Sequence, residues 1–407
     1  MPTFSLRHGA SLCLWLLFSA STTASINDGA EWDDWGDEAS SDSPWLPLSV
    51  RASASYGQRL HRAPTNPTQG QQRSLAELRS QFDSGYRGQQ FNADLRLDLA
   101  YDDIRNRWDL DWRQASVSLS PAAGLELKLG RQILTWGTAD LLFVNDLFRK
   151  DWQAFFNGQP QDYLKAASNA VKLSWFGQRL NADLIYQPRF EADNALLSLD
   201  ATGAPPTAAE PNQEVLATRL FGQWQRLEWA LYQHHGYSGS ASLTATGHSE
   251  FAPVDAIGAS VTAPIGGGIG NIEWGKQWYQ GNGQSDQSLL LLGYQRSLPQ
   301  QLTLGLQYQW QRWHQPYRSG DQWRHYRQLA TVRLDKHSLQ QKLTLSLFAF
   351  YSPSDADYYL RPQLRYRHSD QWQFSFGVNL LDGRHPNTFF SQLHQHSNGW
   401  LRLQYFY

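Results

Sequence analysis

The sequence predicts an all-β fold, a transmembrane antiparallel β-barrel of about 18 strands, with about 16 as the alternative count. Three observations support it: apolar and polar residues alternate, short turns alternate with long loops, and the C-terminal segment is alternating and aromatic. The 407 residues include 18 Trp, 18 Tyr and 19 Phe, which excludes a disordered chain. Beyond the N-terminus no apolar run reaches the roughly 20 residues of a membrane helix. With 35 basic and 37 acidic residues, we expect no nucleic acid partner.

The first 24 residues are typical of a secretory signal peptide. Arg7 and His8 precede an apolar stretch, and small residues follow up to Ala24. The apolar stretch is too short to span a bilayer. Cys13, the only cysteine, lies in the segment that cleavage would remove. We therefore expect an exported chain without thiols or Cys-based metal sites.

Residues 25–45 are rich in Asp and Glu and carry few apolar side chains. This composition predicts a flexible, solvated acidic segment, with a docking peptide for a periplasmic partner as the alternative. The barrel is expected over residues 46–407.

From Pro44 onward, apolar or aromatic residues alternate with polar or small ones. In FNADLRLDLAY (residues 91–101), Leu95 and Leu99 share one face, and Asp94 and Asp98 share the other. Helical spacing would scatter these residues around an axis, so strands are the better interpretation. Candidate strands begin near Leu48, Ala76, Gln89, Trp108, Leu125, Asn169, Leu180, Val215, Leu227, Val254, Ile269, Ser288, Gln301, His325, Lys342, Tyr358, Trp372 and Gly399.

The connections between these strands are alternately short and long. The short ones include residues 121–124, 177–178, 225–226, 264–268, 299–300 and 369–371, and the long ones residues 60–74, 138–167, 191–212, 239–251, 314–323 and 382–398. Short periplasmic turns at one rim and long outer loops at the other are typical of outer-membrane barrels. The last segment, WLRLQYFY, ends at Tyr407 and resembles the C-terminal strand signal that the barrel assembly machinery binds. The expected location is the outer membrane of a Gram-negative bacterium, with its lipid as a partner.

If the apolar face contacts lipid, the charged residues between line the lumen. The late strands and the first strand would form a basic wall of Arg51, Arg327, Arg333, Arg361, Arg365, Arg367 and Arg402. The early strands would form an acidic wall of Asp94, Asp98, Asp102, Asp109 and Asp111. Such a transverse field orients dipolar solutes, and rows of Arg favour anions. The alternative is that these charges pair with one another, as Arg79, Arg96 and Arg113 can do on the acidic side.

The connection over residues 138–167 is too apolar to extend into water. It carries Leu141, Leu142, Phe143, Val144, Leu147, Phe148, Trp152, Phe155 and Phe156. Folding into the barrel would bury these side chains and create a constriction lined by Asp140, Asp146, Arg149, Lys150 and Asp151. A short helix on the rim, or a ridge that binds a partner, is the alternative.

The segment before this loop carries a family motif of Gly130, Arg131, Gln132, Trp136, Gly137 and Asp140. It resembles the GRQ…WG…D signature of an uncharacterised proteobacterial outer-membrane β-barrel family, whose members are often associated with RND-type (MMPL-like) exporters. The resemblance implies an RND-type exporter as a partner. The segment is similar more loosely to the GRQ strand of alginate-export porins, which implies an eighteen-stranded, Arg-lined conduit. Residues 148–151 (FRKD) depart from the Asn-Pro-x-Asp continuation that the family pattern implies.

Strict alternation from Leu125 would point Arg131 toward lipid, which is costly in the middle of a bilayer. A bulge at Gly130 that turns Arg131 inward would resolve the conflict. The alternative is that the motif only sets the strand register and anchors the loop.

Histidines fall mostly in predicted outer loops, and no carboxylate or Cys completes a metal-ligand spacing around His394 and His396. We therefore expect no catalytic residue, no metal and no cofactor. The sequence predicts a porin-like channel for an unidentified solute, lipid-like molecule or polymer, with loop 138–167 narrowing its lumen. The alternative is an outer-membrane receptor or adhesin, or an assembly partner of an export system, that acts through its loops.

Overall fold

The computed structural model describes residues 44–61, 72–194, 208–243, 249–281, 284–319 and 322–407. The predicted signal peptide and nearly all of the predicted acidic segment lie outside the described residues. No helix in the described part of the chain is both long and apolar enough to cross a membrane.

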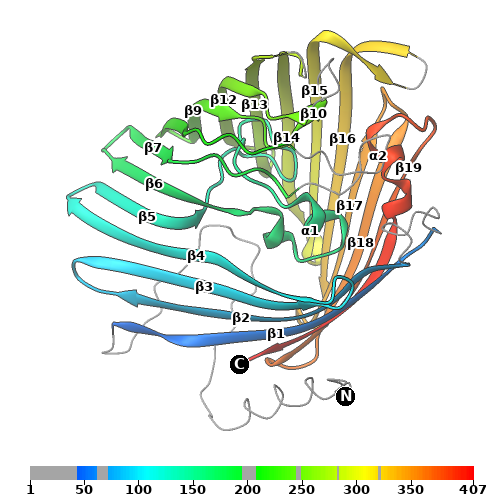
Figure 1. The fold of residues 1–407 in the computed structure, drawn as a ribbon, viewed down its shortest axis with the longest axis horizontal. Helices are drawn as coiled ribbons and strands as arrows, with labels where there is room; N and C mark the ends of the chain where they lie inside the picture. Colours follow the sequence, from blue (N-terminus) through cyan, green and yellow to red (C-terminus); the bar gives the residue numbers. More distant parts are fainter. Residues whose placement is uncertain (1–43, 62–71, 195–207, 244–248, 282–283, 320–321) are drawn as a thin grey trace, which may run out of the picture.

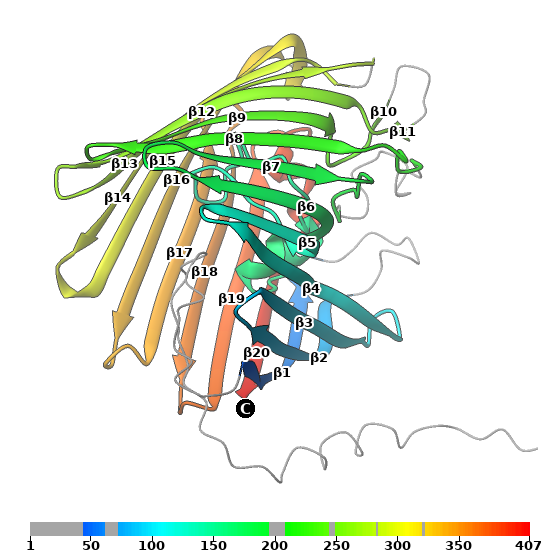
Figure 2. The ribbon, with the colours of Figure 1, turned by 90° about the vertical axis from the view of Figure 1, so that its left-hand side faces the viewer.

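Eighteen antiparallel strands close into one barrel (Figures 1 and 2). The first nine are β1 (Trp45–Arg59), β2 (Arg73–Arg87), β3 (Phe91–Asp102), β4 (Arg107–Ala122), β5 (Leu125–Ile133), β6 (Ala167–Phe176), β7 (Asn181–Gln187), β8 (Val215–Trp224) and β9 (Leu227–Tyr237). The other nine are β12 (Pro253–Ile265), β13 (Gly268–Tyr279), β14 (Gln287–Leu298), β15 (Leu302–Ser319), β16 (Gln322–Ser338), β17 (Leu343–Ser352), β18 (Asp357–Arg367), β19 (Trp372–Gly383) and β20 (Asn398–Phe406). β20 pairs with β1 and closes the ring, so the predicted fold class and strand count are confirmed.

The remaining elements lie in the connections. β10 (Ser242–Leu243) and β11 (Ser249–Glu250) form a small hairpin of their own. Two short α-helices are present, α1 (Trp152–Phe156) and α2 (Phe389–Gln392), together with the 3-10 helices η1 (Gln161–Leu164), η2 (Pro299–Gln301) and η3 (His394–His396).

One predicted loop is wrong. Residues 314–323, expected to form a long connection, mostly continue β15 and β16. The two strands pair up to Ser319 and Gln322 after a register irregularity between Arg312 and Tyr317. Strand pairing therefore continues through a stretch whose polar composition indicated a loop.

The alternation predicted from the sequence separates the two faces of the wall. Leu95, Trp310 and Phe376 are exposed on the outside, where lipid would cover them, whereas Asp98 and Gln309 are buried on the inside. A wall that is apolar outside and polar inside is the arrangement of an outer-membrane barrel.

The connection between β5 and β6, residues 134–166, lies inside the ring of strands and is called the inserted segment below (Figure 1). Its apolar side chains, among them Val144, Phe156 and Leu164, pack against inward-facing residues such as Leu291 and Tyr359 on the opposite wall. Burial of these side chains is the physical reason that this apolar stretch does not extend into water.

Candidate functional site

The inserted segment is anchored at its start by Glu273, a fully buried carboxylate on β13. One carboxylate oxygen accepts hydrogen bonds from the backbone N–H groups of Thr138 and Ala139, and from the Thr138 hydroxyl at 2.9 Å. The amide of Asn145 reaches the other oxygen at 3.3 Å. A buried carboxylate with several donors is a strong anchor because these hydrogen bonds are charge-assisted.

A depression in the inner wall receives the next part of the segment. Gly258 on β12 and Gly275 on β13 are direct cross-strand partners. A Cβ atom at Gly258 would overlap the Asn145 side chain, and one at Gly275 would lie 3.1 Å from Cγ1 of Val144. The two glycines therefore let the backbone of the segment approach the wall closely.

The five predicted constriction residues are bound into several separate networks. Asp140 pairs with Arg333 on β16 at 2.6 Å. Asp146 and Lys150 are both buried and form an ion pair of 2.9 Å. Lys150 also donates to the carbonyl oxygen of Phe148 at 2.7 Å, so its buried charge is fully engaged.

The other two predicted residues, Arg149 and Asp151, face the connection between β7 and β8. Arg149 pairs with Glu191 at 3.2 Å and donates to the carbonyl oxygen of Ala192 at 2.7 Å. Asp151 accepts from the backbone N–H of Ala154 at 2.7 Å and caps α1. Burial raises the pKa of Asp151. The β7–β8 connection therefore straps the inserted segment from one side.

The far end of α1 is held by side chains of β18, β19 and β20, two of which belong to the predicted basic wall. Helix ends leave carbonyl groups without intrahelical partners. Asn379 and Asn398 donate to the carbonyl oxygen of Phe156 at 3.2 and 2.9 Å. Arg402 donates to the carbonyl oxygen of Gly158 at 2.8 Å, and Arg361 to that of Gln159 at 3.2 Å.

The side chain of Trp400 on β20 packs against the same turn. Its buried ring lies against Gly377, its cross-strand partner on β19, and against Gly158 of the inserted segment. Gly158 has a φ of +83°, and a Cβ atom there would overlap the indole ring. The positive φ and the close contact both require glycine.

Tyr163 ties the last part of the segment to the acidic wall. Its ring lies between two guanidinium groups, 4.6 Å from Arg79 and 4.3 Å from Arg113. Its hydroxyl donates to Asp98 at 2.5 Å, and also contacts Gln81 at 3.3 Å. Two cation–π contacts and a charge-assisted hydrogen bond fix the ring inside the barrel.

Each predicted acidic-wall residue has a basic neighbour. The pairs are Asp94 with Arg87 (2.6 Å), Asp98 with Arg79 (2.7 Å), Asp102 with Arg105 (3.6 Å), Asp109 with Arg107 (3.0 Å) and Asp111 with Arg131 (3.9 Å). This arrangement favours mutual pairing, the alternative reading of the acidic wall.

The basic-wall residues lie in three places. Arg327, Arg333, Arg361 and Arg402 contact carboxylates or the inserted segment; Arg327, for example, pairs with Asp355 at 2.9 Å. Arg365 and Arg367 lie at the end of β18 next to the predicted periplasmic turn over residues 369–371. Arg51 on β1 lies 5.8 Å from the ring of Phe406.

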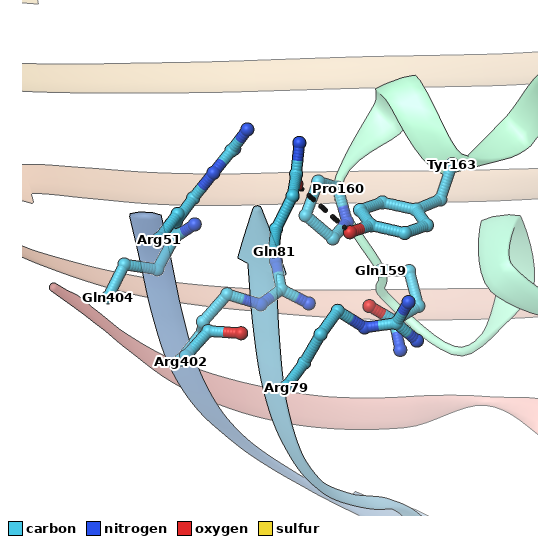
Figure 3. Close-up of a pocket in the computed structure, with 9 residues that line it drawn as sticks. Arg51, Arg79, Gln81, Gln159, Pro160, Tyr163, Arg402 and Gln404 are labelled. Atoms are coloured by element: carbon cyan, nitrogen blue, oxygen red, sulfur yellow. Dashed lines mark hydrogen bonds between the residues drawn. The ribbon is translucent and has the colours of Figure 1, made fainter. Parts of the chain in front are cut away.

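A small pocket lies where the barrel closes, between β1, β2, β20 and the inserted segment (Figure 3). It is lined by Arg51, Ser53, Arg79, Gln81, Gln159, Pro160, Tyr163, Arg402 and Gln404. Of its three guanidinium groups, that of Arg79 pairs with Glu77 and Asp98, and that of Arg402 donates to the carbonyl oxygen of Gly158. Arg51 adds a further positive charge to the lining.

The family motif lies at the root of the inserted segment. The strand register continues without a shift through Gly130, so the expected bulge is wrong. Gly130 has a φ of +113° instead, and a Cβ atom there would overlap the carbonyl oxygen of Ala115. The charge of Arg131 is satisfied within the protein, because its guanidinium group donates to the carbonyl oxygen of Trp112 at 2.7 Å and pairs with Glu191 at 3.1 Å.

The rest of the motif also has anchoring contacts. Gln132 donates to the carbonyl oxygen of Ala170 at 3.1 Å, and the buried Trp136 packs edge-on against Phe148. Gly137 has a φ of +93° directly before the residues that bind Glu273. These contacts favour the reading in which the motif anchors the loop.

Sequence reasoning missed Glu273, Tyr163 and Trp400. Glu273 was detectable as an isolated carboxylate at an inward position of GIGNIEWGKQW, between Asn271 and Gly275 on the same face. Tyr163 and Trp400 gave no signal that distinguishes them from other aromatic residues of the chain.

No family model matches the chain, and no curated protein matches it. Similar solved structures include Acinetobacter baumannii OccAB4 (TM-score 0.57, 11% identity) and Pseudomonas aeruginosa OccK5 (TM-score 0.56, 12% identity). Pseudomonas aeruginosa OccK2, solved in complex with glucuronate, is similar at a TM-score of 0.57 and 12% identity. Each comparison covers 88% of this chain and 97% of the other. At this identity the likeness shows the fold, which is that of an eighteen-stranded outer-membrane β-barrel of the porin type.

Proposed function

We propose that this protein is a channel of the Gram-negative outer membrane that conducts small anionic solutes past the inserted segment. The observation that carries the proposal is the attachment of this segment across the lumen. It is bound to Glu273 on one side and to Asp98 and Arg402 on the other. A segment fixed at both ends narrows a lumen without moving freely in it, as expected for a selective channel.

The preference for anions is supported by the number and the positions of the arginines on the inner wall. Arg51 lines the pocket at the barrel closure, and Arg365 and Arg367 extend the basic row toward the periplasmic turn. Glucuronate, bound in the structure of OccK2, belongs to the same chemical class of organic anions.

Planar-bilayer recording of the purified protein tests the proposal. We expect defined single-channel steps in KCl, and a reversal potential in a KCl gradient that indicates preference for chloride over potassium. A lumen that conducts no ions under any condition would contradict the channel. Conductance with preference for potassium would contradict the anion preference alone.

We further propose the export and assembly route that the sequence predicts. Removal of residues 1–24 would release the chain into the periplasm, and the barrel assembly machinery would bind the strand that ends at Tyr407. The pairing of β20 with β1 and the backbone bonds between Val50 and Tyr407 are compatible with a closing role for this strand. Partnership with an RND-type exporter stays a prediction from the motif.

A further inference from the structure

The strands that follow β4 are shorter than the strands at the start of the barrel. β1, β2 and β4 have 15, 15 and 16 residues, whereas β5 and β7 have 9 and 7. A strand advances about 3.3 Å per residue, so seven residues tilted by about 40° cover roughly 18 Å of height. The apolar band of an outer-membrane barrel is about 25 Å tall. The shortest strand therefore covers less than the full height of the band.

The first half of β4, residues 107–114, has a free edge beside these short strands. β3 pairs with β4 from Arg107 to Leu119, but β5 pairs with β4 only from Ala115 onward. Residues 107–114, all of them described, thus have no strand partner on the β5 side. Their outward side chains are the exposed Trp108, Leu110 and Trp112. Since large apolar side chains of this kind face a bilayer, the free edge lies at membrane height.

Two arginines close the gap along this edge. Arg131 at the end of β5 donates to the carbonyl oxygen of Trp112 at 2.7 Å. Arg113, which is buried, donates to the carbonyl oxygens of Asp162 and Lys165 in the inserted segment at 2.9 and 3.3 Å. Side-chain hydrogen bonds thus replace the backbone ladder that joins paired strands. Such contacts can break without breaking strand pairing.

A second pocket lies beside this edge. It is lined by Asn169, Pro188, Arg189, Glu191 and Glu210. Asn169 is the cross-strand partner of Arg131, and Glu191 forms an ion pair with Arg131 at 3.1 Å. The free edge of β4 and the adjoining ends of β5 and β6 are called the seam below. The seam is therefore apolar on its outer side and adjoins a polar pocket with charges of both signs.

We propose that this seam, between residues 107–114 of β4 and the ends of β5 and β6, is a lateral exit for an amphipathic solute. The solute would pass from the lumen into the outer leaflet, with its apolar part against Trp108, Leu110 and Trp112. Its polar end would contact Arg113 and Arg131. A free strand edge at membrane depth is tolerated only where protein covers it or where it borders a water-filled cavity. In the closed seam, Arg131 and the inserted segment cover the edge. While a solute passes, the edge would border the lumen. The inference rests on the proposed channel, which delivers the solute to the lumen.

The test joins the two sides of the seam covalently. Asp111→Cys and Arg131→Cys replace side chains that approach to 3.9 Å, and a short bis-maleimide links the two thiols. Apart from these, the only cysteine is Cys13 in the predicted signal peptide. The matched control, Val261→Cys with Ile272→Cys, links outward cross-strand partners of the continuously paired strands β12 and β13. The readouts are uptake of the amphipathic anionic dye 8-anilinonaphthalene-1-sulfonate by intact cells and KCl conductance of the purified protein.

The unlinked seam variant should take up the dye several-fold faster than the wild type, because it lacks the Arg131 bridge. The linker should abolish this uptake and leave KCl conductance intact, and the control linker should change neither readout. Dye uptake that the seam linker leaves unchanged overturns the lateral exit while the channel stands. Absence of dye uptake in the wild type and in the unlinked variant, with KCl conductance intact, overturns it as well. Loss of KCl conductance in every protein, with dye uptake still blocked by the linker, supports the seam and contradicts the axial channel.

Discussion

The hydroxyl of Tyr163 donates a 2.5 Å hydrogen bond to the carboxylate of Asp98, and this contact joins the end of the inserted segment to β3. Tyr163→Phe removes the hydrogen bond and keeps the ring between Arg79 and Arg113. We expect the attachment of the end of the segment to weaken by about 1.5–3 kcal/mol, the range for hydrogen bonds to charged groups. Hydrogen exchange of residues 159–166 should accelerate accordingly. Tyr405→Phe on β20 is the control, and equal exchange in both variants would contradict the role of the hydroxyl.

Glu273 should control the other end of the segment. In Glu273→Ala the N–H groups of Thr138 and Ala139 lose their acceptor. Each lost hydrogen bond to a charged group should weaken the attachment of the segment by about 1.5–3 kcal/mol. The strands should still close, because Glu273 supports the segment through its side chain alone. We expect faster proteolysis within residues 134–166 and noisier single-channel currents. Glu228→Gln on β9 serves as the control, and unchanged proteolysis of the Glu273 variant would show that other contacts suffice.

The turn after α1 should not tolerate a side chain at Gly158. Gly158→Ala places a Cβ atom on the ring of Trp400 and strains a φ of +83°. We expect displacement of the turn, loss of the Arg402 hydrogen bond and a changed single-channel conductance. Gly399→Ala, where no atom lies within 4 Å of the added Cβ, should behave like the wild type. Equal conductance in the two variants would mean that the turn does not border the conduction path.

The arginines should separate into selectivity and structural groups. Replacing Arg51, Arg365 and Arg367 together by Gln should lower the preference for anions and leave the inserted segment protected from exchange. Arg361→Gln should instead release the carbonyl group of Gln159 and accelerate exchange there. Reversal potentials in a KCl gradient and hydrogen exchange measure the two effects. Unchanged selectivity in the triple variant would remove the anion preference from the proposed function.

The connection between β19 and β20 should weaken in acid. Burial and the nearby Arg59 lower the pKa of His396 from 6.5 to about 4, so the folded protein favours the neutral ring. The unfolded connection binds a proton first as pH falls, so the stability that neutral His396 contributes is lost between about pH 6.5 and 4. Hydrogen exchange of residues 384–397 should therefore accelerate over this window. In His396→Gln the acceleration should disappear, whereas His368→Gln on a turn at the other rim should retain it.

Alternation was sufficient to predict the barrel, because one face of each strand contacts lipid and the other a polar interior. It also placed Arg361 and Arg402 on the inner wall. Their partners could not be predicted, since these are backbone carbonyl groups of a segment more than 200 residues away in the sequence. The positive φ of Gly130 was likewise hidden, because it leaves the strand register unshifted. Contacts inside the lumen join residues that are far apart in the sequence and meet only in the closed barrel. Local sequence patterns carry no information on which of these residues meet.

The position of Trp400 and Arg402 on the last strand sets the order in which the molecule is completed. The inserted segment belongs to the first half of the chain, yet its turn at Gly158 docks on side chains that are synthesised at the very end. Until β18, β19 and β20 pair, the side chains that receive this turn are not in place. Docking of the inserted segment is consequently a late step, which follows assembly of the C-terminal strands.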